Sequence, residues 1–453
     1  MLIGLGIGLT HIRRSGSGAG RLLGSETNGL ALAASDQSLA IRDTTTPANA
    51  YASAGIVSGG ALIGPGGKLT YASPSPKLCQ QSDGTYKYGA HNLYLNSAAP
   101  ANQSVTVQSG ASYTMTVTGT VSITLSGATT GTITSAAPVV FTAGTATLTC
   151  GSTSGSGTVH LRLTNSVTDY ISNSGTALYA IPYEWDASGN MIGIRYEQAR
   201  TNLFLNNRAA ATQNITVSAT AYTLSFFGTG TITLSGTSTA GPLVGTGATD
   251  RVTLTFTPTA GTLTCTVSGS MDLVQVEAGT YASSPIITYG STVTRAADDI
   301  YLLTSAFPYS ATAGTLFCEF ATPAGSGWGS NISYAATLKN WPTTTDVAGL
   351  YRYNDNIGGA VVSSNVTEAD LNRASYVTSA YQTVKATIAF TANDARVAVD
   401  GVLTSQDTSV TMPSGVTRLG LTRNIVHGVG GHIRRILYVP RRMSDAELQA
   451  LTA

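Results

Sequence analysis

The chain has 453 residues, of which 10% are charged and 42% hydrophobic, and its formal net charge at pH 7 is +1. Such a weak charge excludes the basic field that nucleic-acid-binding proteins use to attract phosphates. The hydrophobic fraction also argues against a disordered chain, although the sequence contains 50 glycines. We therefore expect a folded protein of about three domains that does not bind nucleic acid.

The N-terminal region is rich in glycine, and its apolar runs are short. The opening MLIGLGIGLT is shorter than the roughly 20 apolar residues that span a bilayer, and it lacks the basic start and cleavage site of a secretory signal. We expect residues 1–36 to form an extended arm that attaches to a neighbouring protein, without membrane insertion. Residues 37–90 hold short apolar runs broken by Gly and Pro, which predicts an irregular β subdomain with an Asp83–Gly84 turn.

The middle of the chain contains the same pattern twice. Residues 91–150 and 201–265 share the phrases HNLYLN/TNLFLN and ITLSG and both end in TLTC, at an offset of about 110 residues. A repeat of this length is a duplicated domain, because solenoid units are usually ~20–50 residues long. We therefore predict a module A over residues 91–176, and a related module B, preceded by a hairpin, over residues 177–299.

Both modules show the period-two alternation of half-buried strands. In module A, Tyr113, Met115 and Val117 alternate with threonine, and module B repeats this pattern. Short strands separated by Gly and Ser turns are typical of antiparallel, jelly-roll-like sandwiches. The hairpin that precedes module B has a Gly-Asn turn at residues 189–190, and its aromatic residues are expected in a core or hinge; these are Tyr183, Trp185 and Tyr196.

The four cysteines suggest neither disulfides nor zinc. Cys150 and Cys265 occupy equivalent positions in the two copies, and equivalent positions of separate domains do not face each other. No CxxC or Cys/His spacing of a zinc site occurs. We expect buried free thiols at all four positions, which are Cys79, Cys150, Cys265 and Cys318.

Residues 300–453 form a domain of a different character. Strand-like runs end in GHIRRILYVPRRMSDAELQALTA, where a helix is expected with Ser444 and Glu447 as a capping box before Leu448 and Leu451. This ending, together with the VAVDG strand and turn at 397–401, resembles the concanavalin-A-like/laminin-G superfamily. The resemblance implies two curved antiparallel sheets that often bind glycans or proteins, sometimes with calcium. The expected fold class is thus all-β, with tandem sandwiches followed by a concanavalin-A-like sandwich.

Four ordered phrases resemble segments of bacteriophage tail and virion structural proteins. They are EQARTNLFLN (197–206), SFFGTGTITLSG (225–236), QVEAGTYASSP (275–285) and TRAADD (294–299). In those proteins such phrases precede a lectin-like domain, so the resemblance implies a virion surface protein with carbohydrate-binding-like modules. Module A departs from the pattern, because it has GAHNLYLN in place of EQARTNL and has no TRAAD exit.

A catalytic reading has little support in the sequence. Retaining glycosidases need two carboxylates about 5–5.5 Å apart, and glucanases of the concanavalin-A-like superfamily carry them as E-x-D-x-E on one strand, a triplet that this chain lacks. Glu184 and Asp186 stand apart from the lectin-like domain in sequence, and EAD at 368–370 is expected in a loop or short helix. His427 and His432 flank a Gly-rich turn without a third ligand. We expect no enzyme, no catalytic residue and no metal site.

An aromatic cluster between residues 325 and 356 is the sequence's candidate for glycan binding, because sugar C–H faces stack on aromatic rings. Its members are Trp328, Tyr334, Trp341, Tyr351 and Tyr353. Core packing or contacts between subunits are the alternatives. Asp346, Asp355 and Asn356 offer oxygen ligands to calcium, but without the spacing of a known calcium loop, so no cofactor is expected.

The sequence thus predicts a non-enzymatic phage structural protein of the tail or tail fibre that presents lectin-like sandwiches to host surface polysaccharide. Its partners would be other virion proteins and itself, as a homo-oligomer and most simply a trimer, since avidity makes weak sugar sites useful. It would be made in the host cytoplasm and located on the particle surface. The alternative is a capsid decoration or head-fibre protein that stabilises the shell. Aromatic side chains at 325–356 that point outward would favour the glycan-binding tail protein, and side chains that point inward would favour the decoration protein.

Overall fold

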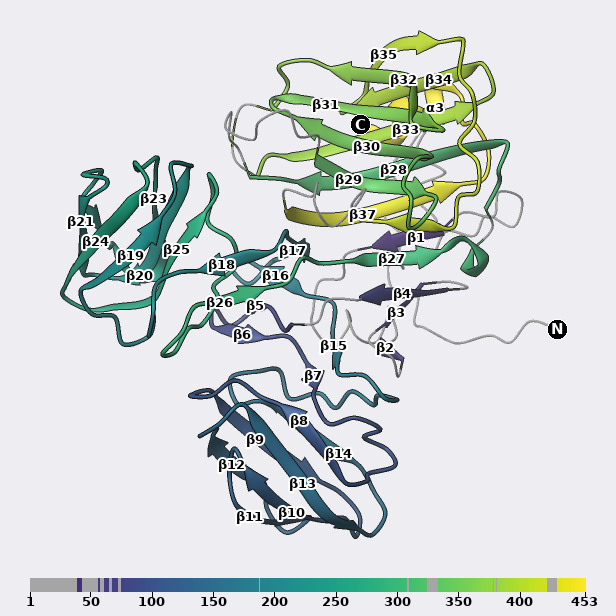
Figure 1. Ribbon diagram of the computed structural model, residues 1–453. Coiled ribbons are helices and arrows are strands. Elements are labelled where there is room, and N and C mark those ends of the chain that lie inside the picture. The colour runs from purple at the N-terminus through teal and green to yellow at the C-terminus, as the bar shows by residue number, and fades with distance from the viewer. Residues whose placement is uncertain are drawn as a thin grey trace.

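The protein is built almost entirely of antiparallel β-sheets arranged as sandwiches, with a short helix near its C-terminal end, which confirms the predicted fold class (Figure 1). The computed structural model describes strands at 39–42, 56–57, 61–64 and 67–71, and then residues 75–453 apart from 187, 308, 324–332, 378, 380 and 422–429. Within these residues, no helix is long and apolar enough to cross a bilayer. The predicted arm at 1–36 lies outside them.

Module A is a sandwich of two sheets whose strand orders are β11–β10–β13–β8 and β12–β9–β14. Its strands are β8 (Gln103–Thr106), β9 (Ser112–Val117), β10 (Ser122–Gly127), β11 (Gly131–Thr134), β12 (Val139–Thr142), β13 (Thr147–Ser154) and β14 (Val159–Leu163). Tyr113, Met115 and Val117 are buried between the sheets. The alternation in the sequence therefore identified the core face of β9 correctly.

Module B repeats this sandwich, with strand orders β19–β24–β21–β22 and β23–β20–β25. Its strands are β19 (Gln213–Val217), β20 (Tyr222–Gly228), β21 (Thr231–Gly236), β22 (Leu243–Val244), β23 (Gly247–Phe256), β24 (Gly261–Ser268) and β25 (Met271–Ala278). Tyr222 stacks on Phe256 as Tyr113 stacks on Phe141 in module A, at interplanar angles of 27° and 26°. The duplication seen in the sequence is thus a duplication of the fold.

A buried asparagine closes each sandwich at the same place. In module B, Asn202 donates to the carbonyls of Val274 and Ile286 and accepts from the amides of Phe204 and Val276, at 2.9–3.1 Å. In module A, Asn92 makes the same four bonds with the equivalent backbone groups. The Asn-Leu that opens each copy of the repeat is therefore retained because one amide satisfies four buried backbone groups.

A second contact also occurs in both modules, between an asparagine and a hydroxyl residue. The two residue types have exchanged positions between module A and module B. In module A, the side-chain oxygen of Asn173 accepts from the backbone N–H of Ser97, and the backbone N–H of Asn173 donates to the Ser97 hydroxyl. In module B the amide side chain is Asn207 and the hydroxyl is Thr288, with the same reciprocal bonds. The exchange preserves both hydrogen bonds, although the aligned residues differ in type.

Replacing Asn202 with alanine is expected to lower the free energy of unfolding by about 2–4 kcal/mol, because it leaves buried backbone N–H and C=O groups without partners. Thermal unfolding with chemical denaturation checks this value. Asn214→Ala is the matched control, since Asn214 is exposed and bonds only an exposed threonine side chain; it should change stability by less than about 0.5 kcal/mol. Equal effects of the two substitutions would contradict the assignment.

Small two-stranded ribbons connect the modules to the rest of the protein. Strand β5 (Leu78–Gln80) pairs with β6 (Tyr86–Tyr88), β7 (His91–Asn92) with β15 (Leu178–Tyr179), and β18 (Arg200–Asn202) with β26 (Val293–Arg295). The turn between β5 and β6 contains Gly84 at a φ of 77°, as the Asp-Gly signal predicts.

The C-terminal sandwich consists of two larger sheets, called here sheet I and sheet II. Sheet I has the order β16–β17–β37–β28–β33–β34–β35, with β1 also paired to β37. Its strands are β1 (Leu39–Arg42), β16 (Tyr183–Trp185), β17 (Met191–Tyr196), β28 (Ala313–Ala321), β33 (Thr383–Thr391), β34 (Asp394–Val399), β35 (Val402–Asp407) and β37 (Gly431–Val439).

Sheet II has the order β2–β3–β4–β27–β36–β29–β30–β31–β32. Its strands are β2 (Ile56–Val57), β3 (Ala61–Gly64), β4 (Gly67–Tyr71), β27 (Ile300–Leu303), β29 (Ser333–Lys339), β30 (Val347–Tyr353), β31 (Asn356–Ser363), β32 (Val366–Arg373) and β36 (Arg418–Gly420). A short 3-10 turn, η1 (Thr304–Ala306), follows β27. The expectation of a loop or helix at 368–370 was wrong: these residues lie in β32, where Ala369 and Leu371 are buried and Asp370 between them is exposed.

The C-terminal sandwich recruits strands from three separate parts of the chain (Figure 1). Strand β1 pairs with the C-terminal half of β37, while β17 pairs with its N-terminal half; β4 pairs with β27. The sequence predicts that residues 37–90 and the hairpin at 177–203 lie outside the C-terminal domain. In the structure their strands extend both of its sheets.

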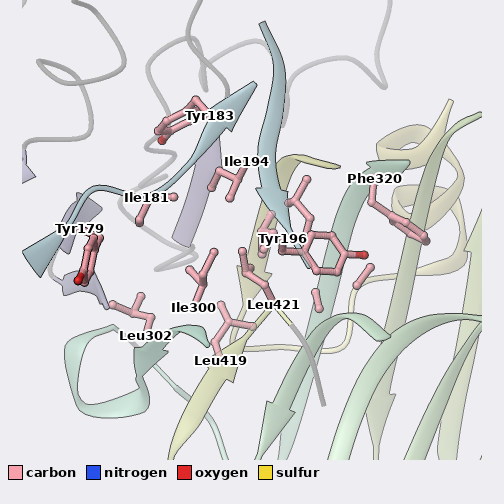
Figure 2. Close-up of a cluster of buried hydrophobic side chains, with 14 of the residues drawn as sticks. Tyr179, Ile181, Tyr183, Ile194, Tyr196, Ile300, Leu302, Phe320, Leu419 and Leu421 are labelled. Carbon is pink, nitrogen blue, oxygen red and sulfur yellow. The ribbon is translucent and has the colours of Figure 1, made fainter. Parts of the chain in front are cut away.

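Figure 2 shows how the segment between the two modules is fixed in this sandwich. Tyr179, Ile181 and Tyr183 of that segment lie in the same buried cluster as residues of β17, β27, β28 and β36. The expectation that Tyr183, Trp185 and Tyr196 are core residues is confirmed, at 8%, 4% and 1% exposure.

The C-terminal helix α3 (Asp445–Thr452) covers the outer face of sheet I. Ser444 caps it with the predicted reciprocal bonds to Glu447, and Leu448 and Leu451 pack with Phe317. The four cysteines are free and buried, as expected.

Candidate functional site

A cleft of about 530 Å³ lies where module B, the β16–β17 hairpin and sheet I meet. We call it the junction cleft. Its volume is within the range of about 300–1,000 Å³ that is usual for small-ligand sites. Its charged and aromatic lining consists of Tyr86, Glu184, Trp185, Asp186, Arg195, Arg251, Tyr281, Tyr381, His432 and Arg434.

Module B supplies one wall of the cleft from the outer face of β20 and β23. Because alternate side chains of β23 point to opposite faces, Val252 and Leu254 pack against the module core while Arg251, Thr253 and Thr255 line the cleft. This wall therefore offers hydroxyl groups, which both donate and accept hydrogen bonds, around one guanidinium group.

The β16–β17 hairpin supplies a fixed carboxylate. Glu184 accepts from Arg195 at 3.2 Å and from the Nε2 of His432 at 2.6 Å. Burial opposes ionisation of Glu184, but the Arg195 charge and the His432 hydrogen bond lower its pKa to about 2. Burial lowers the pKa of His432, so the imidazole is neutral at pH 7. Glu184 is distant in sequence from the C-terminal domain, but strand pairing brings it into sheet I.

Tyr381 provides an accessible ring at the edge of the cleft. It is 37% exposed, and its ring lies against the guanidinium of Arg195 at 5.6 Å and the ring of His432 at 5.3 Å. Its backbone has a φ of 54°, and its amide donates to the carbonyl of Thr322. These contacts hold Tyr381 in place, while part of the residue remains exposed at the cleft.

Behind the cleft lies a fully buried ionic network centred on Glu197. Its carboxylate contacts Arg195 at 2.7 Å, Arg295 at 3.1 Å and Lys77 at 3.5 Å, and it accepts from the amide of Ser284. Asp298 pairs with Lys77 and accepts from the amide of Glu197. Burial opposes ionisation of Glu197, yet the surrounding cations hold its pKa well below its usual value.

A second buried group extends the network into module B. Glu277 accepts from the amide and hydroxyl of Ser283 and from Gln275, and Arg200 lies 3.6 Å from its carboxylate. Apart from Lys77 and Arg195, the residues of the two groups come from three of the four phrases that resemble segments of phage virion proteins. The phrases EQARTNL, QVEAGTYASSP and TRAADD therefore encode the contacts that fix module B to sheet I, and their polar residues are structural.

Neither carboxylate that lines the junction cleft has the raised pKa of a general acid in glycoside hydrolysis. Such hydrolysis needs a carboxyl group whose pKa is raised so that it can give up a proton. Glu184 has a lowered pKa and is held by two partners, and hydrogen bonds from Asn190 and Ser188 lower the pKa of Asp186. Both are thus ionised at neutral pH.

The predicted aromatic cluster does not form one surface among the described residues, and Trp328 lies outside them. Tyr334 and Tyr351 are each 2% exposed and touch edge to face, 5.8 Å between centroids, on the side of sheet II turned away from the main core. Each ring lies across a glycine of the next strand, Gly349 and Gly358 respectively. These two rings are therefore buried packing groups, and the expectation that they face a ligand was wrong for both.

The other two members of the cluster are partly exposed. The Trp341 ring contacts the cations of Arg418 and Lys339, at 4.7 and 5.0 Å from the ring centroid. Tyr353 packs at the edge of the Tyr334–Tyr351 cluster. Whether either ring contacts a sugar stays a prediction.

The oxygen atoms considered for calcium serve other contacts. Asp346 accepts from the amide and hydroxyl of Ser414, and Asn356 accepts from the amide of Ser375. Asp355 lies 3.7 Å from Arg352. In the part of the chain that the structure describes, no three His, Cys, Asp or Glu side chains converge as metal ligands do; His427 falls outside that part.

The main residues of the cleft, Arg251 and Tyr381, are not among the site residues predicted from the sequence. A signal for Arg251 was present: it is an outward residue of an alternating strand, and module A has Ala136 at the position that matches when Phe141 is aligned with Phe256. Tyr381 carried no comparable signal, because it follows a turn and meets its neighbours only through strand pairing.

No protein-family model matches the chain, and no curated protein matches its sequence. Solved structures match part of the fold. The CBM40 module of a Ruminococcus gnavus sialidase bound to α2,3-sialyllactose is 16% identical, with a TM-score of 0.27, over 32% of this chain and 84% of that chain. Domain 4 of AbnA, a GH43 arabinanase of Geobacillus stearothermophilus in complex with arabinotriose, is 12% identical, with a TM-score of 0.28, over 35% and 73%.

The binding domain of botulinum neurotoxin serotype D is also similar, at 12% identity and a TM-score of 0.28, over 34% of this chain and 39% of that chain. The sugars named with the first two structures are ligands of those proteins.

Proposed function

We propose that this protein is a glycan-binding structural protein without enzymatic activity, and that the sugar binds in the junction cleft. The observation that carries this proposal is the combination of a partly exposed tyrosine, Tyr381, with a wall of threonine hydroxyls in a cleft of suitable volume. An aromatic ring matches the C–H face of a sugar, and hydroxyl groups match its alternating donors and acceptors.

The phage phrases and the tandem sandwiches support a location on the particle surface, in the tail or tail fibre. In this proposal the protein is made in the host cytoplasm, docks to other virion proteins through its N-terminal arm, and forms a homo-oligomer, most simply a trimer. Many copies held together would raise the avidity of a weak sugar site for host polysaccharide. Light scattering after size exclusion tests the trimer, and immunogold labelling of purified particles tests the location.

Replacing Tyr381 with alanine is expected to weaken glycan binding about thirtyfold, because truncation of a central aromatic contact typically costs about 2 kcal/mol. Glycan-array screening of the full chain identifies the sugar, and calorimetry then gives the dissociation constants. Tyr353→Ala and Trp341→Ala are the controls, since they test the sequence-predicted cluster and leave the cleft intact. If either control loses binding while Tyr381→Ala binds as well as the unchanged protein, the site lies on sheet II instead.

The second candidate, a decoration protein that stabilises a capsid, is favoured by the burial of Tyr334 and Tyr351, because that reading requires these rings to be packed rather than exposed to a ligand. Particles lacking the protein separate the two functions. The glycan-binding proposal expects lost adsorption to host cells with unchanged thermal stability of the particle, and the decoration proposal expects the reverse.

A further inference from the structure

The charges that line the junction cleft do not balance, and the excess is positive. Arg195 is neutralised, because it contacts both Glu184 and Glu197. The Asp186 carboxylate is held within its own turn by Ser188 and Asn190. Two guanidinium groups, those of Arg251 and Arg434, line the same cleft. Among the described residues neither forms an ion pair within 4.0 Å with a carboxylate, although the Arg434 charge attracts the Asp186 carboxylate and helps to lower its pKa.

Arg251 is held in position by neutral groups alone. It donates to the backbone carbonyl of Ser283 and, at 2.9 Å, to the hydroxyl of Ser225. Its Nε–H has no hydrogen-bond partner in the described part of the chain. Burial lowers the pKa of Arg251 despite the attraction of the Glu277 carboxylate, which already pairs with Arg200 at 3.6 Å. Such a charge is unfavourable unless an anion compensates it.

Arg434 holds its place at the mouth of the cleft by donating from Nε to the carbonyl of Ile192 at 3.2 Å, which is again a neutral acceptor. The two arginines come from different parts of the fold, β23 of module B and β37 of sheet I. A ligand that contacts both therefore joins the two bodies that form the cleft.

Module A provides an internal comparison. When Phe141 is aligned with Phe256, module A has Ala136, Pro138 and Val140 where module B has Arg251, Thr253 and Thr255. Val140 is 62% exposed. The cationic, hydroxyl-rich face thus belongs to module B, and a shared sandwich fold does not require it.

We propose that the ligand of the junction cleft is an acidic saccharide whose carboxylate contacts Arg251 and Arg434 while a sugar ring stacks on Tyr381. This inference rests on the proposed function and narrows it to one substrate class. A guanidinium group binds a carboxylate through parallel N–H···O bonds, a geometry that a neutral sugar hydroxyl does not offer.

The test compares acidic oligosaccharides with their methyl esters, which keep the sugar rings but remove the charge. The full-length protein is titrated with oligogalacturonate, hyaluronan oligosaccharides and sialyllactose, each in acid and ester form. We expect the acid form of at least one of them to bind more than tenfold tighter than its ester, and this preference to fall as sodium chloride increases.

Arg251→Gln should abolish the preference for the acid form while weak binding of the ester remains, and Arg434→Gln should reduce it. Arg251→Lys serves where the glutamine variant unfolds, since it keeps the charge but loses the planar contact and should reduce the preference severalfold. Arg208→Gln is the matched control: Arg208 lies in the same module, is 49% exposed and pairs with Asp272 outside the cleft, and its loss should leave binding unchanged.

Equal binding of acid and ester forms, or a preference unaffected by Arg251→Gln, overturns this inference while glycan binding stands. If neither form of any saccharide binds and Tyr381→Ala changes nothing on the array, the proposed function fails with it.

Discussion

Replacing Glu197 with glutamine is expected to lower the free energy of unfolding by about 3–5 kcal/mol, the usual cost of removing one partner from a buried ionic cluster. The Glu197 side chain is fully buried and contacts Lys77, Arg195 and Arg295. After the substitution these three cations share two carboxylates, Glu184 and Asp298. Differential scanning calorimetry should show a lower melting temperature for the transition that includes module B and sheet I.

The same substitution should change how stability depends on pH. A glutamate in the unfolded chain has a pKa of about 4.3, whereas the cations hold the pKa of Glu197 well below that value in the folded protein. The stabilisation is therefore nearly complete above about pH 5 and is lost as the pH falls further, because the unfolded chain takes up the proton first. Glu197→Gln should flatten this loss between pH 5 and pH 3.

Asp272→Asn is the control for both measurements. Asp272 forms an ion pair with Arg208, but both side chains are nearly half exposed, and exposed pairs contribute only about 0–1 kcal/mol. If the Glu197→Gln and Asp272→Asn variants have the same melting temperature, the buried cluster does not hold the junction together.

A fragment of residues 300–453 is expected to aggregate or to unfold without a cooperative transition. It lacks β1 and β17, which pair with β37, and β4, which pairs with β27. Removing them exposes strand edges in both sheets, and open edges pair with other chains. Size-exclusion chromatography and circular-dichroism melting of the fragment check this result.

Removal of module A provides a matched control for the fragment. The amide of Ala180 donates to the carbonyl of Ala90 at 2.7 Å, so a short glycine–serine linker can join the chain there and delete the module. Because strand pairing in both sheets is kept, this shortened protein should still melt cooperatively. A monomeric 300–453 fragment that melts at the temperature of the full chain would contradict the requirement for the recruited strands.

The sequence by itself determined the local features of this protein. The alternation of Tyr113, Met115 and Val117, the duplicated Asn-Leu start and the Ser444 capping box all depend on contacts within a strand, a module or one helical turn. Such contacts leave a periodic or short-range pattern, so the all-β class, the repeated sandwich and the final helix were all predictable.

Only the tertiary structure decided which strands share a sheet and where a ligand fits. Residues separated by more than 200 positions, such as Glu184 and His432, meet because β17 pairs with β37. Strand pairing is made by backbone groups that are alike in every residue, so the sequence does not name the partner. The polar phrases around Glu197 and Glu277 were visible as a resemblance, but their burial against sheet I, which shapes the junction cleft, follows from long-range pairing alone.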